Sequence, residues 1–290
     1  MLRGTGRRSR RTLVEFAGVF ACAMAMLATS AAPMRAQGAT TKQATPPRPG
    51  TPKLPKTLAI PGTFEELFAE RDARARSAVG YMRCLQGTIN ALRGGALGNV
   101  PTGWSIACVE QGKEWRGVFG ELGETGIAVR LQVAFRDGRG AITRDAVDTA
   151  RVNGAARALL RGLSVPLPGA GKYEFTPVPL PQPTFMELWF LPVPNGGRPI
   201  VGGDSLIQMT TDGTRELGHA KSTPPIRLLT PPSTAESWTV PSLEERIPTV
   251  SELVAAYLAL EVVKEVRIKT RQYESTISRD AKGWTHRQPI

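Results

Sequence analysis

Three side chains in the second half of the chain are candidates for acid–base chemistry, and the first is Glu187. It lies in an apolar segment that reads as a strand, and its face is shared by Phe185, Trp189 and Leu191. Burial among apolar neighbours raises the pKa of a carboxyl group, and a raised pKa suits a general acid. Paired with Asp204, Glu187 would resemble a glycosidase dyad. The alternatives are a glutamate on a half-exposed face and an aspartate in a glycine-flanked bulge.

The third candidate is His219, one of only two histidines in the chain. It would be the general base of a hydrolase, but no serine stands in the Gly-x-Ser-x-Gly turn that exposes a nucleophile. The alternative is a hydrogen-bonded polar residue at the end of a strand. The other histidine, His286, is expected near a frayed terminus. The sequence lacks His-Glu-x-x-His, Cys-x-x-Cys and a glycine-rich phosphate loop, so we predict no metal and no cofactor.

The cysteines predict one disulfide. Cys22 lies in the N-terminal leader, which leaves Cys84 and Cys108 in the remainder of the chain. In an oxidising compartment such a pair is expected to form a bond, closing a loop worth roughly 3 kcal/mol of stability. Two buried thiols or a redox pair are the alternatives, although the wide spacing lacks the proximity that tunes a reactive thiolate.

The first 36 residues have the order of a signal peptide. Residues 1–12 carry five arginines and no acid, and residues 16–32 form an apolar run that is short for a membrane span. The run Ser9-Arg10-Arg11-Thr12-Leu13-Val14 resembles a twin-arginine export motif, although Glu15 interrupts the apolar stretch after it. The general secretory route and an uncleaved membrane anchor are the alternatives. We therefore expect export, to the periplasm or the extracellular space.

The net charge of +12 is concentrated before the globular region. Residues 1–36 contribute +5 and residues 37–62 contribute +4, which leaves +3 for residues 63–290. A nearly balanced domain gives no electrostatic reason to expect phosphate-backbone binding, so nucleic acid is excluded as a partner. Residues 37–62 are rich in Pro, Thr and Lys and lack aromatic residues, which is typical of a semi-extended linker.

The candidate residues must be positioned by helices and antiparallel strands. Thr63 and Glu66 fit a capping box that begins a long helix to about Leu92. Strands are predicted over 104–109, 115–122 and 127–135, as a meander. In the third strand five apolar side chains are expected on one buried face, with the other face in water: Ile127, Val129, Leu131, Val133 and Phe135. A helix over 144–163 follows, weakened by Gly154.

A second group of strands is predicted over 173–178, 184–193, 200–211, 214–220 and 226–229, with hairpin turns at Asn195-Gly196 and Asp212-Gly213. Residues 231–248 read as irregular. Thr249 or Ser251 caps a short helix through Leu260, and a closing hairpin over residues 262–284 turns at residues 279–283. The fold class is α+β, with antiparallel meander sheets, a long N-terminal helix and two shorter helices. Residues 63–290 form one globular region or two parts divided near residue 165.

Together these features predict an exported, non-catalytic protein of the cell envelope. Its partner would be an envelope protein or a small ligand, with no transmembrane span left once the signal peptide is removed. A periplasmic hydrolase that uses Glu187, Asp204 or His219 is the first alternative. A structural component of the envelope is the second.

Overall fold

A computed structural model describes residues 63–93, 104–112, 114–136, 139–167, 172–194, 198–221, 225–244, 246–281 and 283–288. The predicted signal peptide and linker lie outside the described residues. Within the described part, three helices and four sheets, mostly antiparallel, form the predicted α+β architecture. None of these helices combines the length and the apolar character that crossing a membrane requires.

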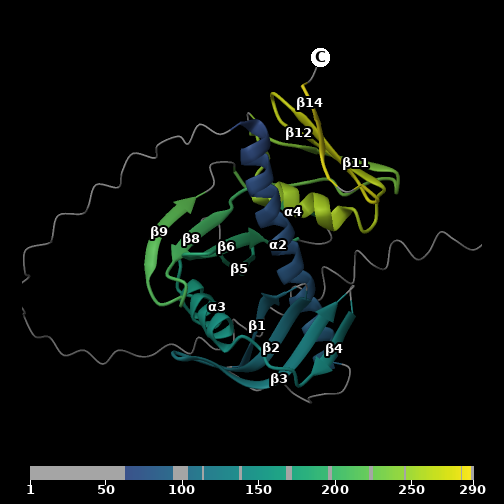
Figure 1. Cartoon of the computed structure of the whole chain (residues 1–290). Coiled ribbons are helices and arrows are strands. Elements are labelled where there is room, and N and C mark those ends of the chain that lie inside the picture. Colours follow the sequence, from purple (N-terminus) through teal and green to yellow (C-terminus); the bar gives the residue numbers. More distant parts are fainter. Residues whose placement is uncertain are drawn as a thin grey trace, which may run out of the picture.

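Helix α2 (Phe64–Ala91) is the axis of the molecule, and three sheets lie around it (Figure 1). The predicted capping box is confirmed, because the Thr63 hydroxyl accepts from the Glu66 amide at 3.3 Å and the Glu66 carboxylate accepts from the Thr63 amide at 2.9 Å. Buried apolar side chains form a stripe along the helix, at intervals of one, three, four or seven residues: Phe64, Phe68, Ala75, Ala78, Val79, Met82 and Ile89.

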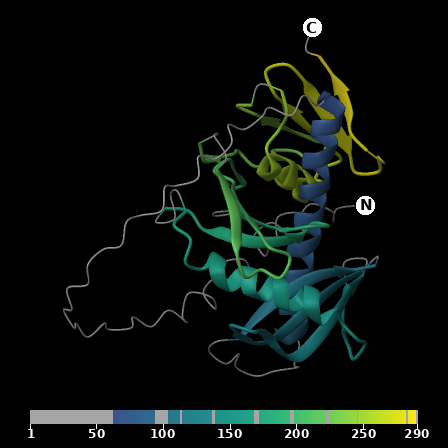
Figure 2. The same cartoon turned by 60° about the vertical axis from the view of Figure 1, so that its left-hand side comes forward.

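The meander sheet is built in sequence order from four antiparallel strands: β1 (Trp104–Gln111), β2 (Glu114–Gly123), β3 (Gly126–Arg136) and β4 (Arg139–Thr143). The sequence did not indicate β4, which is short and largely exposed. Helix α3 (Thr149–Gly162) begins later than predicted, because Asp148 is its N-cap and accepts from the Arg151 amide at 3.1 Å. In two views α2 and α3 lie on opposite faces of the meander sheet (Figures 1 and 2).

A bulge in β3 explains why both faces are covered and why the prediction of a single buried face was wrong. Phe119 pairs with Leu131 but Gly120 pairs with Val129, so Arg130 is an extra residue in the ladder. Such a residue reverses the alternation of side chains beyond it. Ile127 therefore packs with α3, whereas Val133 lies on the α2 face beside Gly140. Val129 remains 37% exposed.

The central sheet has the order β5-β6-β8-β9 and is antiparallel throughout: β5 (Phe175–Pro181), β6 (Met186–Pro192), β8 (Ser205–Met209) and β9 (Glu216–Lys221). The predicted strand 200–211 is broken at Gly202 and Gly203, whose φ angles are 79° and 69°. Its first part, β7 (Ile200–Val201), pairs instead with β10 (Arg227–Leu228). The predicted hairpin at Asp212-Gly213 joins β8 to β9, while Asn195-Gly196 lies outside the described residues.

Both faces of the central sheet are also covered. One face packs on α3 through Leu188, Phe190 and Ile207, and the other contributes Val178 and Leu191 to the cluster around α2. Gly154, expected to weaken α3, lies where this helix meets the β8–β9 turn. A Cβ atom there would stand 2.7 Å from the Thr211 carbonyl oxygen, so glycine is what allows the close approach.

The C-terminal sheet contains a crossover that the sequence reading missed. Its order is β11-β12-β13-β14: β11 (Ser237–Pro241), β12 (Glu265–Lys269), β13 (Glu274–Ser278) and β14 (Thr285–Arg287). Strand β11 lies in the stretch predicted to be irregular and runs parallel to β12. Helix α4 (Val250–Ala259) connects the two, and its N-cap is Thr249, one of the two predicted caps.

Aromatic side chains pack this sheet against the first turns of α2. Phe64 stacks on Tyr273 with ring centroids 4.0 Å apart, and the His286 ring lies edge-on to Phe68 at 4.3 Å. The Trp284 indole N–H donates to the Asp72 carboxylate at 2.9 Å. His286 is thus part of a packed strand, β14, and not of a frayed end.

Candidate functional site

The central sheet separates the three candidate residues. In its register Glu187 pairs with Gln208 and His219 pairs with Ile207, and alternate residues of a strand point to opposite faces. Glu187 faces α2, where it contacts Arg74, whereas His219 shares the face of Ile207, which packs on α3. Asp204 bonds to the start of α4. The three side chains therefore do not form one cluster.

Glu187 is fully buried and paired with an arginine. The Arg74 guanidinium donates from Nε and Nη2 to the two carboxylate oxygens, each at 2.8 Å. The Trp189 indole N–H donates to Oε2 at 2.9 Å, which confirms that Trp189 shares this face. Both oxygens accept hydrogen bonds from protein groups and the side chain is fully buried, so the carboxylate is not presented to solvent or to a substrate in this conformation. Its evident effect is to hold α2 against the central sheet.

A second buried acidic cluster surrounds the N-terminus of α4. Asp204 Oδ2 accepts from the Ser251 amide at 2.9 Å, and Glu252 accepts from the Arg227 guanidinium and the Ser242 hydroxyl, each at 2.8 Å. Glu252 was not predicted as a site residue. Its place at the start of α4 could have been inferred from the sequence, because it is the glutamate of the capping box that begins with Thr249. Asp204 Oδ1 is buried and has no hydrogen-bond partner among the described residues.

Burial raises the pKa of both carboxyl groups. For Asp204 the loss of solvation outweighs the hydrogen bonds from Ser251, which act in the opposite direction. For Glu252 burial is again the largest cause, and the neighbouring charge of Asp204 adds to it. Two carboxyl groups in one dry site each disfavour the ionisation of the other.

Because the pKa values of Asp204 and Glu252 are raised, we expect the free energy of unfolding to fall as pH rises above the usual pKa of a carboxyl group. A carboxyl group whose pKa is higher in the folded than in the unfolded chain binds more protons when folded, so the free energy of unfolding falls as pH rises through the window above about pH 4. Asp204→Asn keeps an amide oxygen for the Ser251 N–H and cannot ionise. We expect it to flatten this fall, as measured by urea unfolding of the full chain between pH 4 and 8.

The difference between the parent and Asp204→Asn is the informative quantity, because other groups titrate in both proteins. Burial lowers the pKa of His286, which makes stability rise with pH near neutrality, and hydrogen bonds from Thr210 and Thr214 lower that of Asp212 to about 2. Both contributions cancel in the difference. An equal pH dependence in the two proteins would contradict the assignment to Asp204.

His219 has a partner that sequence reasoning did not identify. Its Nε2 lies 2.9 Å from the Ser205 hydroxyl oxygen, on the neighbouring strand β8. Ser205 is 1% exposed, whereas His219 is exposed. The sequence carries no local signal for this pair, because the register of β8 and β9 brings the two residues together and no local motif does. No carboxylate among the described residues bonds to the His219 ring.

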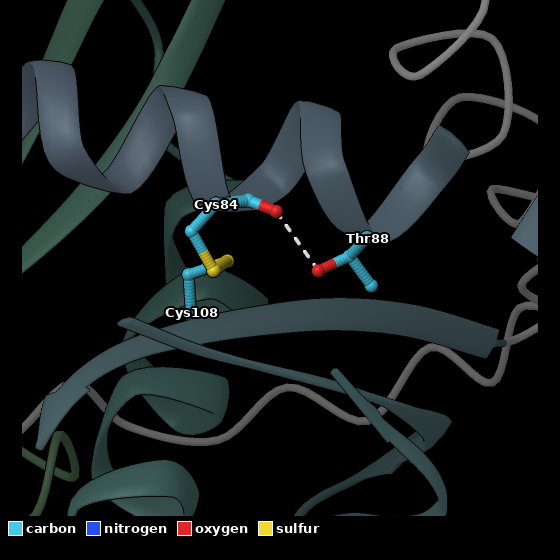
Figure 3. The surroundings of a disulfide bond; sticks show 3 residues. All are labelled: Cys84, Thr88 and Cys108. Carbon is cyan, nitrogen blue, oxygen red and sulfur yellow. Dashed lines mark hydrogen bonds between the residues drawn. A yellow bond between two sulfur atoms is a disulfide. The ribbon is translucent and has the colours of Figure 1, made fainter. Parts of the chain in front are cut away.

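The Cys84–Cys108 disulfide joins α2 to β1 (Figure 3). The Cα atoms are 6.2 Å apart, and both cysteines are buried. The Thr88 hydroxyl, one turn further along the helix, donates to the Cys84 carbonyl oxygen at 2.8 Å. The predicted pairing is present, so neither cysteine is a free thiol in this structure.

No group of three or more His, Cys, Asp and Glu side chains in the described ranges is arranged to hold a metal ion. Comparison with protein-family models, with curated proteins and with solved structures finds no match to this chain.

Proposed function

We propose that this chain is an exported protein that binds a partner protein of the cell envelope by accepting an extended strand at β9. The N-terminal leader supports export, and the buried disulfide supports an oxidising compartment. The observation that carries the binding proposal is the contrast between the two edges of the central sheet.

The β5 edge is closed to strand addition by prolines. The Val193 amide donates to the Glu174 carbonyl oxygen and the Gln182 amide to the Phe185 carbonyl oxygen. These two bonds show which backbone groups of β5 are directed at β6. In this ladder the backbone N–H and C=O groups of the even-numbered β5 residues point toward β6. Those of the odd-numbered residues therefore point outward, away from the sheet. Three of the outward positions are proline and have no N–H to offer: Pro177, Pro179 and Pro181.

The β9 edge has no such protection. Strand β9 pairs only with β8 among the described residues, contains no proline, and lies at the left-hand edge of the sheet in Figure 1. Leu217, the extra residue of a bulge in this strand, is 50% exposed. An open edge with unpaired backbone groups is the surface onto which partner peptides add a strand.

Photo-crosslinking in the intact cell envelope tests this proposal. A benzophenone side chain at position 217 is expected to give a discrete adduct with another protein, and one at position 163 at least tenfold less. Leu163 is a matched control, since it is 48% exposed but lies at the end of α3. Lys221→Pro removes an amide at the end of β9 and should abolish the adduct without changing the unfolding midpoint. Equal adducts at both positions, or adducts insensitive to Lys221→Pro, would contradict the proposal.

A further inference from the structure

The bond between Ser205 and His219 joins a hydroxyl to an imidazole, as in enzymes that use an activated serine. We propose that Ser205 is a nucleophile and His219 its general base, and that the pair transfers acyl groups from carboxylic esters. This activity goes beyond the proposed binding function and does not depend on it.

The strands hold the two side chains in register. Ser205 is the first residue of β8 and pairs with Phe190 on one side and with Lys221 on the other. His219 lies two residues before Lys221 on β9, so the Ser–His contact is a diagonal across the two strands. The ladder on both sides of β8 fixes the serine backbone, while the exposed imidazole can exchange protons with water.

The reaction uses these two groups and water, and because Ser205 is 1% exposed, the ester must approach Oγ from the side of the exposed imidazole. Ser205 Oγ forms a bond to the ester carbonyl carbon as its proton passes to His219 Nε2. The tetrahedral intermediate expels the alkoxide, which takes that proton and leaves as the alcohol. Water, deprotonated by the same imidazole nitrogen, then cleaves the acyl–Ser205 ester, releases the carboxylic acid and restores the hydroxyl.

The surroundings of Ser205 favour an apolar acyl group. Phe190, directly opposite on β6, and Ile207, two residues along β8, belong to the buried cluster on the α3 face. Tyr173 and Ile226 are partly buried against the same cluster. Because no carboxylate in the described part of the chain orients the imidazole, the turnover is expected to be slower than that of a complete triad.

The chain contains a matched control for this pair. Ser275 Oγ lies 2.9 Å from His286 Nδ1, also across neighbouring strands. Its imidazole packs against Phe64 and Phe68, and burial lowers its pKa. The Ser275–His286 pair has the same contact distance as the Ser205–His219 pair, but its ring is less exposed, so we expect it not to react.

A fluorophosphonate probe on the full chain tests the proposal, since Oγ displaces fluoride from phosphorus and the proton again passes to the imidazole. We expect one adduct, located on Ser205 by peptide mass and absent after unfolding in urea. Ser205→Ala should abolish it, and His219→Asn should slow it by at least 100-fold. Ser275→Ala and His286→Asn should leave the rate unchanged.

Two results would overturn the proposal. One is a folded parent protein, verified by circular dichroism, in which Ser205 takes up no probe. The other is a labelling rate that His219→Asn does not change. The crosslink from position 217 should persist in Ser205→Ala, so failure of the reactive pair and failure of partner binding can be told apart.

Discussion

Arg74→Met is expected to lower the free energy of unfolding by about 3–5 kcal/mol. Methionine keeps most of the apolar stem but removes both hydrogen bonds to Glu187, whose carboxylate is fully buried. The charge would then stand in a dry site with only the Trp189 indole as a partner. Urea unfolding of the full chain at neutral pH measures the loss.

Two further variants identify the cause of this loss. Arg83→Met, on the same helix, removes a pair with Glu261 in which both side chains are more than a third exposed, and should cost less than about 1 kcal/mol. The double variant Arg74→Met with Glu187→Leu removes both buried charges and should recover most of the stability lost in the single variant. If the double variant lost as much free energy of unfolding as Arg74→Met and Glu187→Leu lose together when made singly, the two side chains would not be coupled.

Removal of the disulfide is expected to cost about 3 kcal/mol. The bond joins residues 24 positions apart, so its absence gives the unfolded chain the freedom of that loop. Cys84→Ala with Cys108→Ala removes the bond without burying two thiols. The variant should unfold at lower urea concentration than the oxidised parent protein.

Reduction of the parent protein is the matched comparison for this variant. Dithiothreitol should lower the unfolding midpoint of the parent to near that of the alanine variant and should not change the variant itself. Because both cysteines are buried, reduction should be slow unless the chain first unfolds. A parent protein whose unfolding midpoint dithiothreitol leaves unchanged would show that the bond is absent or contributes no stability.

The parts of the fold predicted from sequence are those whose signals are local. Thr63 and Glu66 are three residues apart and indicate the start of α2, and Cys84 and Cys108 are the only cysteines after residue 36. The bulge at Arg130 has no local sequence signal, because it arises from a shift in the register between β2 and β3 at Gly120. The parallel strand β11 was missed for the same reason, since its partner β12 lies beyond α4.

The candidate site shows the same limit. The apolar neighbours of Glu187 were visible in the sequence, but Arg74 is 113 residues away in a run of charges that reads as exposed helix surface. Ser205 and His219 are 14 residues apart, and only the register of β8 and β9 makes them neighbours. Residue type therefore marked the candidates, whereas the partners that decide their chemistry required the structure.

The position of α2 also constrains the order in which the chain can fold. This helix is made before the rest of the described region, yet Asp72 bonds to Tyr257 and Trp284, which follow it by 185 and 212 residues. Such distant contacts make folding slow, because much of the chain must be ordered before they form. A ribosome would therefore release nearly the whole chain before the first turns of α2 could be covered. During that interval the apolar side chains of these turns, Phe64 and Phe68, would be accessible to chaperones.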